Sequence, residues 1–196
     1  MNGAELKQTL KSGGRVFGTM ISIARNPKWI PILDTVGLDY VVIDTEHNYR
    51  SRGELGDFLI MMNTTGVVPI VRIPIPDPHY VTMAMDAGAQ GILAPYCETV
   101  EQVREVVAAA KWRPLKGEAA ERVILSGEHV SDATRSYLED RNKNSICIIG
   151  IESEAAVNEL SAMLEVPGID GIFVGPNDMS ISLGIPDQYD EKIYQD

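Results

Sequence analysis

Six short runs rich in β-branched residues alternate with longer helical stretches, and this alternation limits the possible fold more than any other feature of the sequence. The predicted strands cover residues 16–23, 40–44, 68–73, 91–95, 146–151 and 171–174. The predicted helices cover residues 27–36, 54–63, 78–87, 100–111 and 154–164. Strands that alternate with helices in this way predict βα units and a parallel sheet.

The same glycine-containing turn precedes three of these strands. It reads Val-Gly-Leu-Asp-Tyr at 36–40, Ala-Gly-Ala-Gln-Gly at 87–91 and Pro-Gly-Ile-Asp-Gly at 167–171. A glycine at this place suits a helix that ends in a left-handed cap before a strand begins. Apolar residues also run without polar interruption through 41–43 and 148–149, as expected for strands covered on both faces. These features favour a barrel or a doubly wound sheet.

Residues 113–144 interrupt this rhythm. The segment holds Pro114, two glycines and many charged residues, and residues 132–140 predict a short helix. An insertion of this length after the fourth strand favours a lid or a contact between subunits over an idle linker. Apart from this insertion, residues 1–196 predict a single domain.

The balance of charges excludes several classes of ligand. The chain has 17 Lys and Arg residues against 28 Asp and Glu, a formal net charge of −11, and so acidic a surface repels nucleic acid and anionic membranes. Its apolar runs are far shorter than the ~20 residues of a membrane span, and residues 1–14 lack the apolar core of a signal peptide. We therefore expect a cytoplasmic protein with two reduced, buried cysteines, Cys97 and Cys147.

Polar residues follow nearly every predicted strand. Asp-Thr-Glu-His closes the second strand at 44–47, Arg72 the third, Glu152 the fifth and Gly-Pro-Asn-Asp the sixth at 175–178. Ligands bind at the carboxyl edge of the strands in both barrels and open α/β sheets. The sequence therefore predicts that these side chains meet in one site.

Glu152 and Asp178 are candidate metal ligands because they follow consecutive strands. Two carboxylates, completed by water and substrate, commonly hold Mg²⁺ or Mn²⁺. Either residue alone is explained as well by capping the helix that follows it. The pair favours a metal, since two adjacent carboxylates repel each other unless a cation lies between them.

His47 and Arg72 are the remaining candidates for chemistry. Asp44 and Glu46 are possible partners that raise the basicity of His47 and fix its tautomer, as a general base requires, although Glu46 can instead face the back of the strand. Arg72 ends an apolar strand. It needs an anionic partner there, either a neighbouring carboxylate or the carboxylate or enolate of a substrate.

An ordered set of motifs resembles the HpcH/HpaI aldolase family, the class II metal-dependent pyruvate aldolases, from about residue 14 to residue 185. The motifs are Gly-Thr-Met at 18–20, Asp-Thr-Glu-His at 44–47, Pro-Ile-Val-Arg at 69–72, Asp-Ala-Gly-Ala at 86–89, Ile-Glu-Ser at 151–153 and Gly-Ile-Phe-Val-Gly-Pro-Asn-Asp-Met-Ser at 171–180. Each motif alone is modest, whereas their order and spacing are specific.

The resemblance implies a (β/α)₈ TIM barrel that binds pyruvate or a related 2-oxo acid through Mg²⁺, Mn²⁺ or Co²⁺. It implies an aldolase that cleaves or forms a 4-hydroxy-2-oxo acid from pyruvate and an aldehyde by way of an enolate, in a cytoplasmic homo-oligomer, a hexamer. The implied roles are metal binding for Glu152 and Asp178, general base for His47, enolate stabilisation for Arg72, tuning of the histidine by Asp86, and binding of the substrate carboxylate by Gly175, Pro176 and Asn177.

Two departures from the family pattern leave other functions open. Gly150 stands where the family usually has a glutamine, and residues 112–118 read Trp-Arg-Pro-Leu-Lys-Gly-Glu instead of an aromatic-Pro-Pro stretch followed by Arg-Gly. These departures motivate one alternative, a non-catalytic protein that binds a 2-oxo acid. A second alternative is a CoA-thioester lyase of the citrate lyase β-chain type, which shares the fold and the use of a metal.

The length of the chain sets one further expectation. A closed barrel takes about 250 residues, whereas this chain has 196 and six predicted βα units. An open six-stranded sheet leaves unpaired edges, a liability for a soluble protein. We therefore expect that two βα units are missing and that more chain or another subunit closes the barrel.

Overall fold

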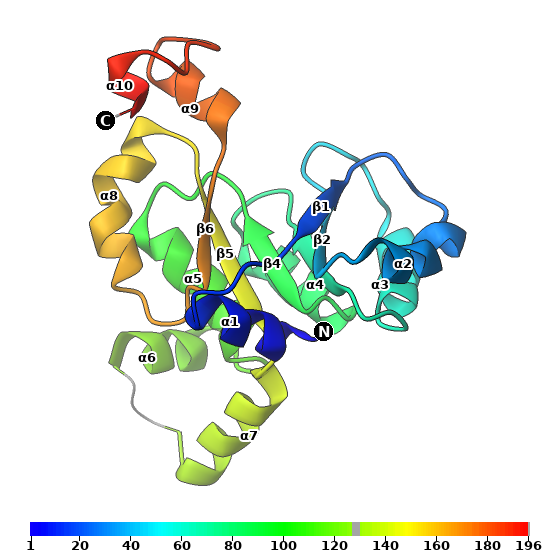
Figure 1. The fold of residues 1–196 in the computed structure, drawn as a ribbon. Coiled ribbons are helices and arrows are strands. Elements are labelled where there is room, and N and C mark those ends of the chain that lie inside the picture. Colours follow the sequence, from blue (N-terminus) through cyan, green and yellow to red (C-terminus); the bar gives the residue numbers. More distant parts are fainter. Residues whose placement is uncertain (127–129, 196) are drawn as a thin grey trace.

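The computed structural model describes residues 1–126 and 130–195, and its centre is a curled parallel sheet (Figure 1). The strands are β1 Gly18–Ile21, β2 Tyr40–Asp44, β3 Val68–Arg72, β4 Gly91–Ala94, β5 Ile146–Ile151 and β6 Gly171–Val174. They lie in chain order from β1 to β6, and every neighbouring pair is parallel. A doubly wound sheet reverses its strand order at a switch point. The observed order does not, so the fold is the expected barrel type, present as a curled part of a barrel.

The two faces of the sheet are covered differently. Val41, Ile92 and Ile149 point outward into the large core that the surrounding helices form. Val42 and Leu93 point inward and, with residues such as Ile70 and Ile146, form a second, smaller apolar cluster. Because side chains alternate between the faces of a strand, this assignment also fixes which polar residues at the strand ends point into the barrel.

Most helices follow a strand along the chain and pack on the outer face, whereas α1 precedes β1 (Figure 1). Their bounds are α1 Gly3–Lys11, the 3₁₀ helix η1 Pro27–Ile32, α2 Leu33–Val36, α3 Arg52–Met62, α4 Pro78–Asp86, α5 Val100–Lys111, α6 Glu118–Ser126, α7 Asp132–Asn142, α8 Glu154–Leu164, α9 Pro176–Ser182 and α10 Lys192–Gln195. Ser51 and Thr99 begin α3 and α5 as capping boxes, in which the cap side chain and the third helical residue exchange hydrogen bonds.

The helix predicted at 27–36 differs from the prediction more than the other helices do, because most of it is a 3₁₀ helix. It divides into η1 and the short helix α2, and Pro31 lies inside η1. In an α-helix the proline ring would clash with the carbonyl group four residues earlier, and the regular α-helix begins only after Pro31. Gly37 then ends α2 in the left-handed conformation that the recurring turn predicts.

The 113–144 segment contains two helices rather than one. Helix α7 confirms the predicted short helix and extends it to Asn142. Helix α6 was not expected, and it forms because Ala120 and Ile124 are buried in the outer core. Residues 127–129 of this segment lie outside the described residues. No helix within the described ranges is both long enough and apolar enough to cross a membrane.

Helix α1 covers the interior of the barrel at the amino ends of the strands. Its Leu6 is buried in the inner cluster, and Nζ of Lys7 donates to the carbonyl oxygen of Ser145 at 2.9 Å. Lys111 forms an ion pair with Asp170, whose Oδ2 also accepts from the backbone N–H of Cys147 at 2.9 Å. These contacts join α1, α5, β5 and the start of β6, and they leave the carboxyl edge of the sheet accessible.

Candidate active site

Asp44 and Arg72 meet at the carboxyl edge of the sheet. They are register partners at the ends of β2 and β3, and they continue the inward-facing series to which Val42 and Ile70 belong. Nε of Arg72 donates to Oδ1 of Asp44 at 2.9 Å, and both side chains are buried. The anionic partner that the sequence requires for Arg72 is therefore a neighbouring carboxylate.

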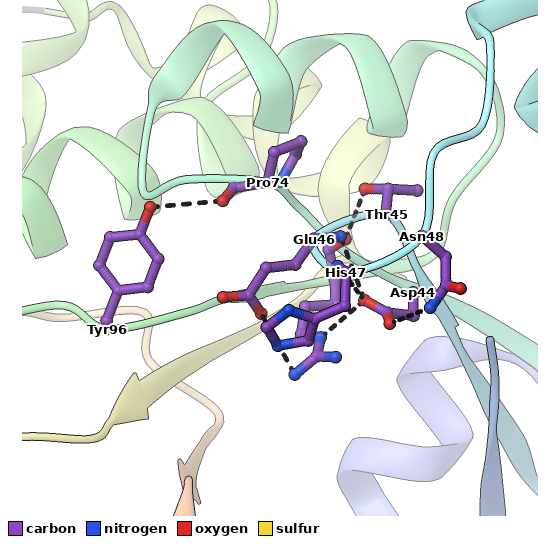
Figure 2. A network of polar contacts seen from close by, with 8 residues as sticks. Asp44, Thr45, Glu46, His47, Asn48, Pro74 and Tyr96 are labelled. Carbon is purple, nitrogen blue, oxygen red and sulfur yellow. Dashed lines mark hydrogen bonds and ion pairs between the residues drawn. The ribbon is translucent and has the colours of Figure 1, made fainter. Parts of the chain in front are cut away.

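The loop after β2 folds back over this pair (Figure 2). Oδ1 of Asp44 accepts from the backbone N–H of Glu46 at 3.1 Å, and Oδ2 accepts from the Asn48 side chain at 2.8 Å. Glu46 faces the site and not the back of the strand, because its Oε2 lies 3.1 Å from Nη1 of Arg72. Arg72 is thus held by two carboxylates.

His47 lies at the rim of the same cluster. Its side chain is 65% exposed, and Nε2 lies 3.7 Å from Oε2 of Glu46. Asp44 contacts the His47 backbone N–H, at 3.4 Å, but the carboxylate beside the imidazole is that of Glu46. Of the two partners predicted for the ring, the structure therefore favours Glu46.

The pKa values of Asp44 and Glu46 shift in opposite directions because the two carboxylates have different partners. Burial alone would raise the pKa of Asp44, but hydrogen bonds from Arg72 and Asn48 and the charge of Arg72 hold that pKa below its usual value. Burial raises the pKa of Glu46 despite the charges of Arg72 and His47, and Glu152 adds to the rise. Asp44 is thus the firmly ionised partner of Arg72.

Glu152 follows β5 and is buried at the same edge of the sheet. Ser153, and not Glu152, caps α8, since its hydroxyl accepts from the N–H of Ala156. Burial raises the pKa of Glu152, the nearby charge of Asp178 raises it further, and the charges of Arg72 and His47 oppose the rise. Three of the other predicted strand-end residues, Asp178, Arg72 and His47, thus act electrostatically on Glu152.

Asp178 and the residues before it begin α9. Gly175 is the N-cap of this helix, and Asp178 is an exposed residue in its first turn. The alternative in which Asp178 caps the helix is therefore wrong. Asn177 is tied to the C-terminal part of the chain, because its Oδ1 accepts from the hydroxyl of Tyr189 at 2.6 Å.

The residues at this edge suit a divalent cation. Four carboxylates, those of Asp44, Glu46, Glu152 and Asp178, share the cluster with one guanidinium and one imidazole. Oε1 of Glu152 is buried with no hydrogen-bond partner among the described residues, and such an atom is costly unless a cation or water satisfies it. No group of three or more His, Cys, Asp or Glu side chains within residues 1–126 and 130–195 is arranged around a cation. The oxygen-rich side chains and the unpartnered Oε1 atom of Glu152 are the features that fit a divalent cation.

Asp86 does not join this cluster within the chain. It is the last residue of α4 and therefore lies near the amino ends of the strands, where its Oδ1 is 3.4 Å from Nη1 of Arg113. The helix runs from the carboxyl end of β3 back to the amino end of β4, so its two ends lie at opposite edges of the sheet. The role that the resemblance assigns to Asp86 stays a prediction.

Tyr96 is a site residue that the sequence did not single out. It follows β4, and its hydroxyl donates to the carbonyl oxygen of Pro74 at 3.4 Å beside the loop cluster (Figure 2). Burial raises the pKa of the Tyr96 phenol, and Glu46 and Glu152 raise it further. The rule that polar residues at strand ends form the site would have found Tyr96 had it been applied to the fourth strand.

Comparison with known proteins agrees with this architecture. Residues 19–195 match the family described as HpcH/HpaI aldolase/citrate lyase. The chain is 31% identical over 178 residues to a hydroxypyruvate/pyruvate aldolase of Roseobacter denitrificans, covering 91% of this chain and 69% of the relative. It is 33% identical over 186 residues to a 2-keto-3-deoxy-L-rhamnonate aldolase of Salmonella gallinarum, covering 92% and 67%.

A solved structure extends the comparison to the fold. The crystal structure of an HpcH/HpaI aldolase from Desulfitobacterium hafniense superposes with a TM-score of 0.80 at 31% identity, covering 97% of this chain and 73% of that one. The fold and the sequence therefore agree. The chain has parallel strands in sequential order with polar residues at their carboxyl ends, and the family match covers nearly the whole chain. The chain belongs to the HpcH/HpaI aldolase/citrate lyase family.

Proposed function

We propose that this chain is a divalent-metal-dependent aldolase that cleaves or forms a 4-hydroxy-2-oxo acid, with pyruvate or a related 2-oxo acid and an aldehyde as the other partners. One observation carries the proposal: the buried Glu152, whose Oε1 has no partner in the described chain, lies within electrostatic reach of Asp178, Arg72 and His47. The names of the aldolase relatives support the same reaction class.

Glu152 and Asp178 would hold the cation, with water and the substrate completing its coordination. Mg²⁺, Mn²⁺ and Co²⁺ all suit such oxygen-rich sites, and Mg²⁺ is commonly held by one or two carboxylates. When bound, a divalent ion draws electron density from a keto oxygen and makes the protons on the adjacent carbon more acidic.

His47 would move the proton of the reacting hydroxyl. In the cleavage direction, the imidazole accepts the proton from the hydroxyl on C4, a carbonyl forms at C4, and the bond between C3 and C4 breaks. The electron pair of that bond passes to the 2-oxo acid as an enolate. Protonation of C3 then gives the free 2-oxo acid. The exposed ring of His47 is accessible to such a substrate.

Arg72 stabilises the negative charge that develops on oxygen during this step. Its guanidinium does not have to reorient for the reaction, since Asp44 and Glu46 already hold two of its nitrogens. A donor fixed in advance and largely shielded from water stabilises charge more strongly than a mobile one. We further propose that the backbone of Gly175, Pro176 and Asn177 receives the substrate carboxylate at the start of α9.

The direct test is aldol cleavage. The protein is incubated with a 4-hydroxy-2-oxo acid and Mn²⁺, and the pyruvate released is measured with a coupled dehydrogenase. We expect release that a chelator abolishes and added Mn²⁺ restores. Release that is unaffected by the chelator would contradict the metal requirement. Cleavage of a CoA thioester without cleavage of any aldol would favour the thioester lyase instead.

A further inference from the structure

The carboxylate of Glu152 lies between two glycines. A Cβ atom added at Gly150 would lie 2.7 Å from Oε1 of Glu152 and 3.0 Å from both Cα of Pro95 and the backbone N of Tyr96. A Cβ atom added at Gly175 would lie 2.8 Å from Cγ and 2.9 Å from Cδ of the same glutamate. The space that side chains would fill at both positions is therefore occupied by Glu152 and by the backbone of Tyr96.

The backbone of Tyr96 has an uncommon conformation at this point. Its φ angle is +32°, in a region that residues other than glycine rarely adopt. Contacts on both sides hold it there: the N–H of Cys97 donates to the carbonyl oxygen of Gly150 at 2.9 Å, and the Tyr96 hydroxyl donates to Pro74 at 3.4 Å (Figure 2). Uncommon conformations that the surroundings enforce in this way concentrate at functional sites.

The backbone N of Tyr96 and the Glu152 carboxylate border the same small space. The position of an added Cβ at Gly150 lies 3.0 Å from the first and 2.7 Å from Oε1 of the second. Gly150 permits the approach, because a Cβ atom there would lie only 2.7 Å from Oε1 of Glu152 and the carboxylate would have to move. Glu152 does not cap α8, because the hydroxyl of Ser153 accepts the hydrogen bond at the start of that helix.

We infer that Gly150 and Tyr96 are positioning residues for Glu152: the bare glycine and the constrained tyrosine backbone together set the direction of this carboxylate at the carboxyl edge of the sheet. This inference rests on the proposed function in one respect: it takes Glu152 to be a ligand of a divalent cation. It also gives Gly150 a role in this chain, since the absent side chain makes room for the glutamate itself.

The first test compares two glycine substitutions within the sheet. Gly150→Ala should lower the affinity for Mn²⁺, measured by electron paramagnetic resonance of the free ion, by about ten-fold or more, as changes around metal ligands typically do. Gly171→Ala is the matched control, because its added Cβ would meet nothing closer than Cγ1 of Ile148 at 3.8 Å. Its affinity should equal that of the unsubstituted protein. Undiminished affinity in Gly150→Ala would overturn the inference.

The second test needs no metal and no change at the glycine. In a ¹⁵N-labelled protein, Glu152→Gln should move the Tyr96 amide proton upfield, because it removes the negative charge that polarises the nearby N–H bond. The amide of Ile21 in β1 should stay in place. An unmoved Tyr96 amide would overturn the inference. Absence of Mn²⁺ binding in the unsubstituted protein would instead refute the proposed function, and the Tyr96 amide would still report on the positioning.

Discussion

Nε of Arg72 lies 2.9 Å from Oδ1 of Asp44, and the two residues are register partners at the ends of neighbouring strands. The pairing of β2 with β3 therefore places a buried cation and a buried anion opposite each other without any loop intervening. Glu46 completes the arrangement from the loop that follows. The site thus begins inside the sheet, and its geometry depends on strand register as much as on side-chain chemistry.

Asp44→Asn should lower the free energy of unfolding by about 2 kcal/mol, the typical contribution of a hydrogen bond to a charged group. Asparagine keeps the shape but removes the charge that faces Arg72. The measurement is urea unfolding followed by circular dichroism. Asp86→Asn is the control: its partner Arg113 lies 3.4 Å away and its side chain is 56% exposed, so the cost should stay below about 1 kcal/mol. Equal losses in the two variants would contradict the account.

The contribution of Asp44 should also depend on pH, with a definite sign. Its pKa is lowered in the folded protein, so its stabilising effect is complete above the unfolded-state pKa of about 3.9 and is lost as the pH falls through the folded-state pKa. The difference in unfolding free energy between the unsubstituted protein and Asp44→Asn should be constant from about pH 7 to pH 5 and shrink below about pH 4. Urea titrations in chelator at several pH values measure it. A difference that grows on acidification would be inconsistent with this pairing.

Arg72→Lys should lower kcat for aldol cleavage about 100-fold or more, even though it retains the charge. A lysine ammonium is a single point of charge and does not span the two carboxylates that orient the guanidinium. Arg104→Lys is the control, because Arg104 lies on α5 and pairs with Glu101 on the same helix. It should leave the rate unchanged. If Arg72→Lys retained full activity, the fixed guanidinium would not be needed.

His47→Ala should separate proton transfer from metal binding. Loss of a general base typically costs about 100-fold or more in kcat, whereas the affinity for Mn²⁺ should stay unchanged. His79→Ala, at the first turn of α4, should affect neither quantity. Weakened Mn²⁺ binding in His47→Ala would make His47 a metal ligand instead of a base.

Much of the fold was predictable because strands β2 to β5 are buried on both faces. Strands β2, β5 and β6 begin and end at the predicted residues. Continuous apolar runs show where a parallel strand lies, and polar residues or glycine mark its end. The curved sheet itself follows from the order of the units. Helix α6 was missed because its packing against the outer core is tertiary, and a charged segment of this kind has no strong local signal.

Those site residues that directly follow a strand could be predicted once the ends of the strands were predicted. Asp44, Arg72 and Glu152 were predicted because polar residues that follow parallel strands meet at the carboxyl edge of the sheet, where ligands bind. The function of Gly150 could not be predicted, since it depends on where Glu152 and the Tyr96 backbone lie in space. The position of Asp86, at the far end of α4 beside Arg113, likewise follows from the direction of that helix and not from its motif.

In the function proposed above, Glu152 and Asp178 hold a cation that activates a 2-oxo acid. The most direct measurement is exchange of the methyl protons of pyruvate in heavy water, followed by proton NMR, because it needs no knowledge of the aldehyde. We predict exchange that requires Mg²⁺ or Mn²⁺, stops with a chelator and is lost in Glu152→Gln. Pyruvate that binds without any metal-dependent exchange would contradict the claim and favour a non-catalytic 2-oxo-acid-binding protein.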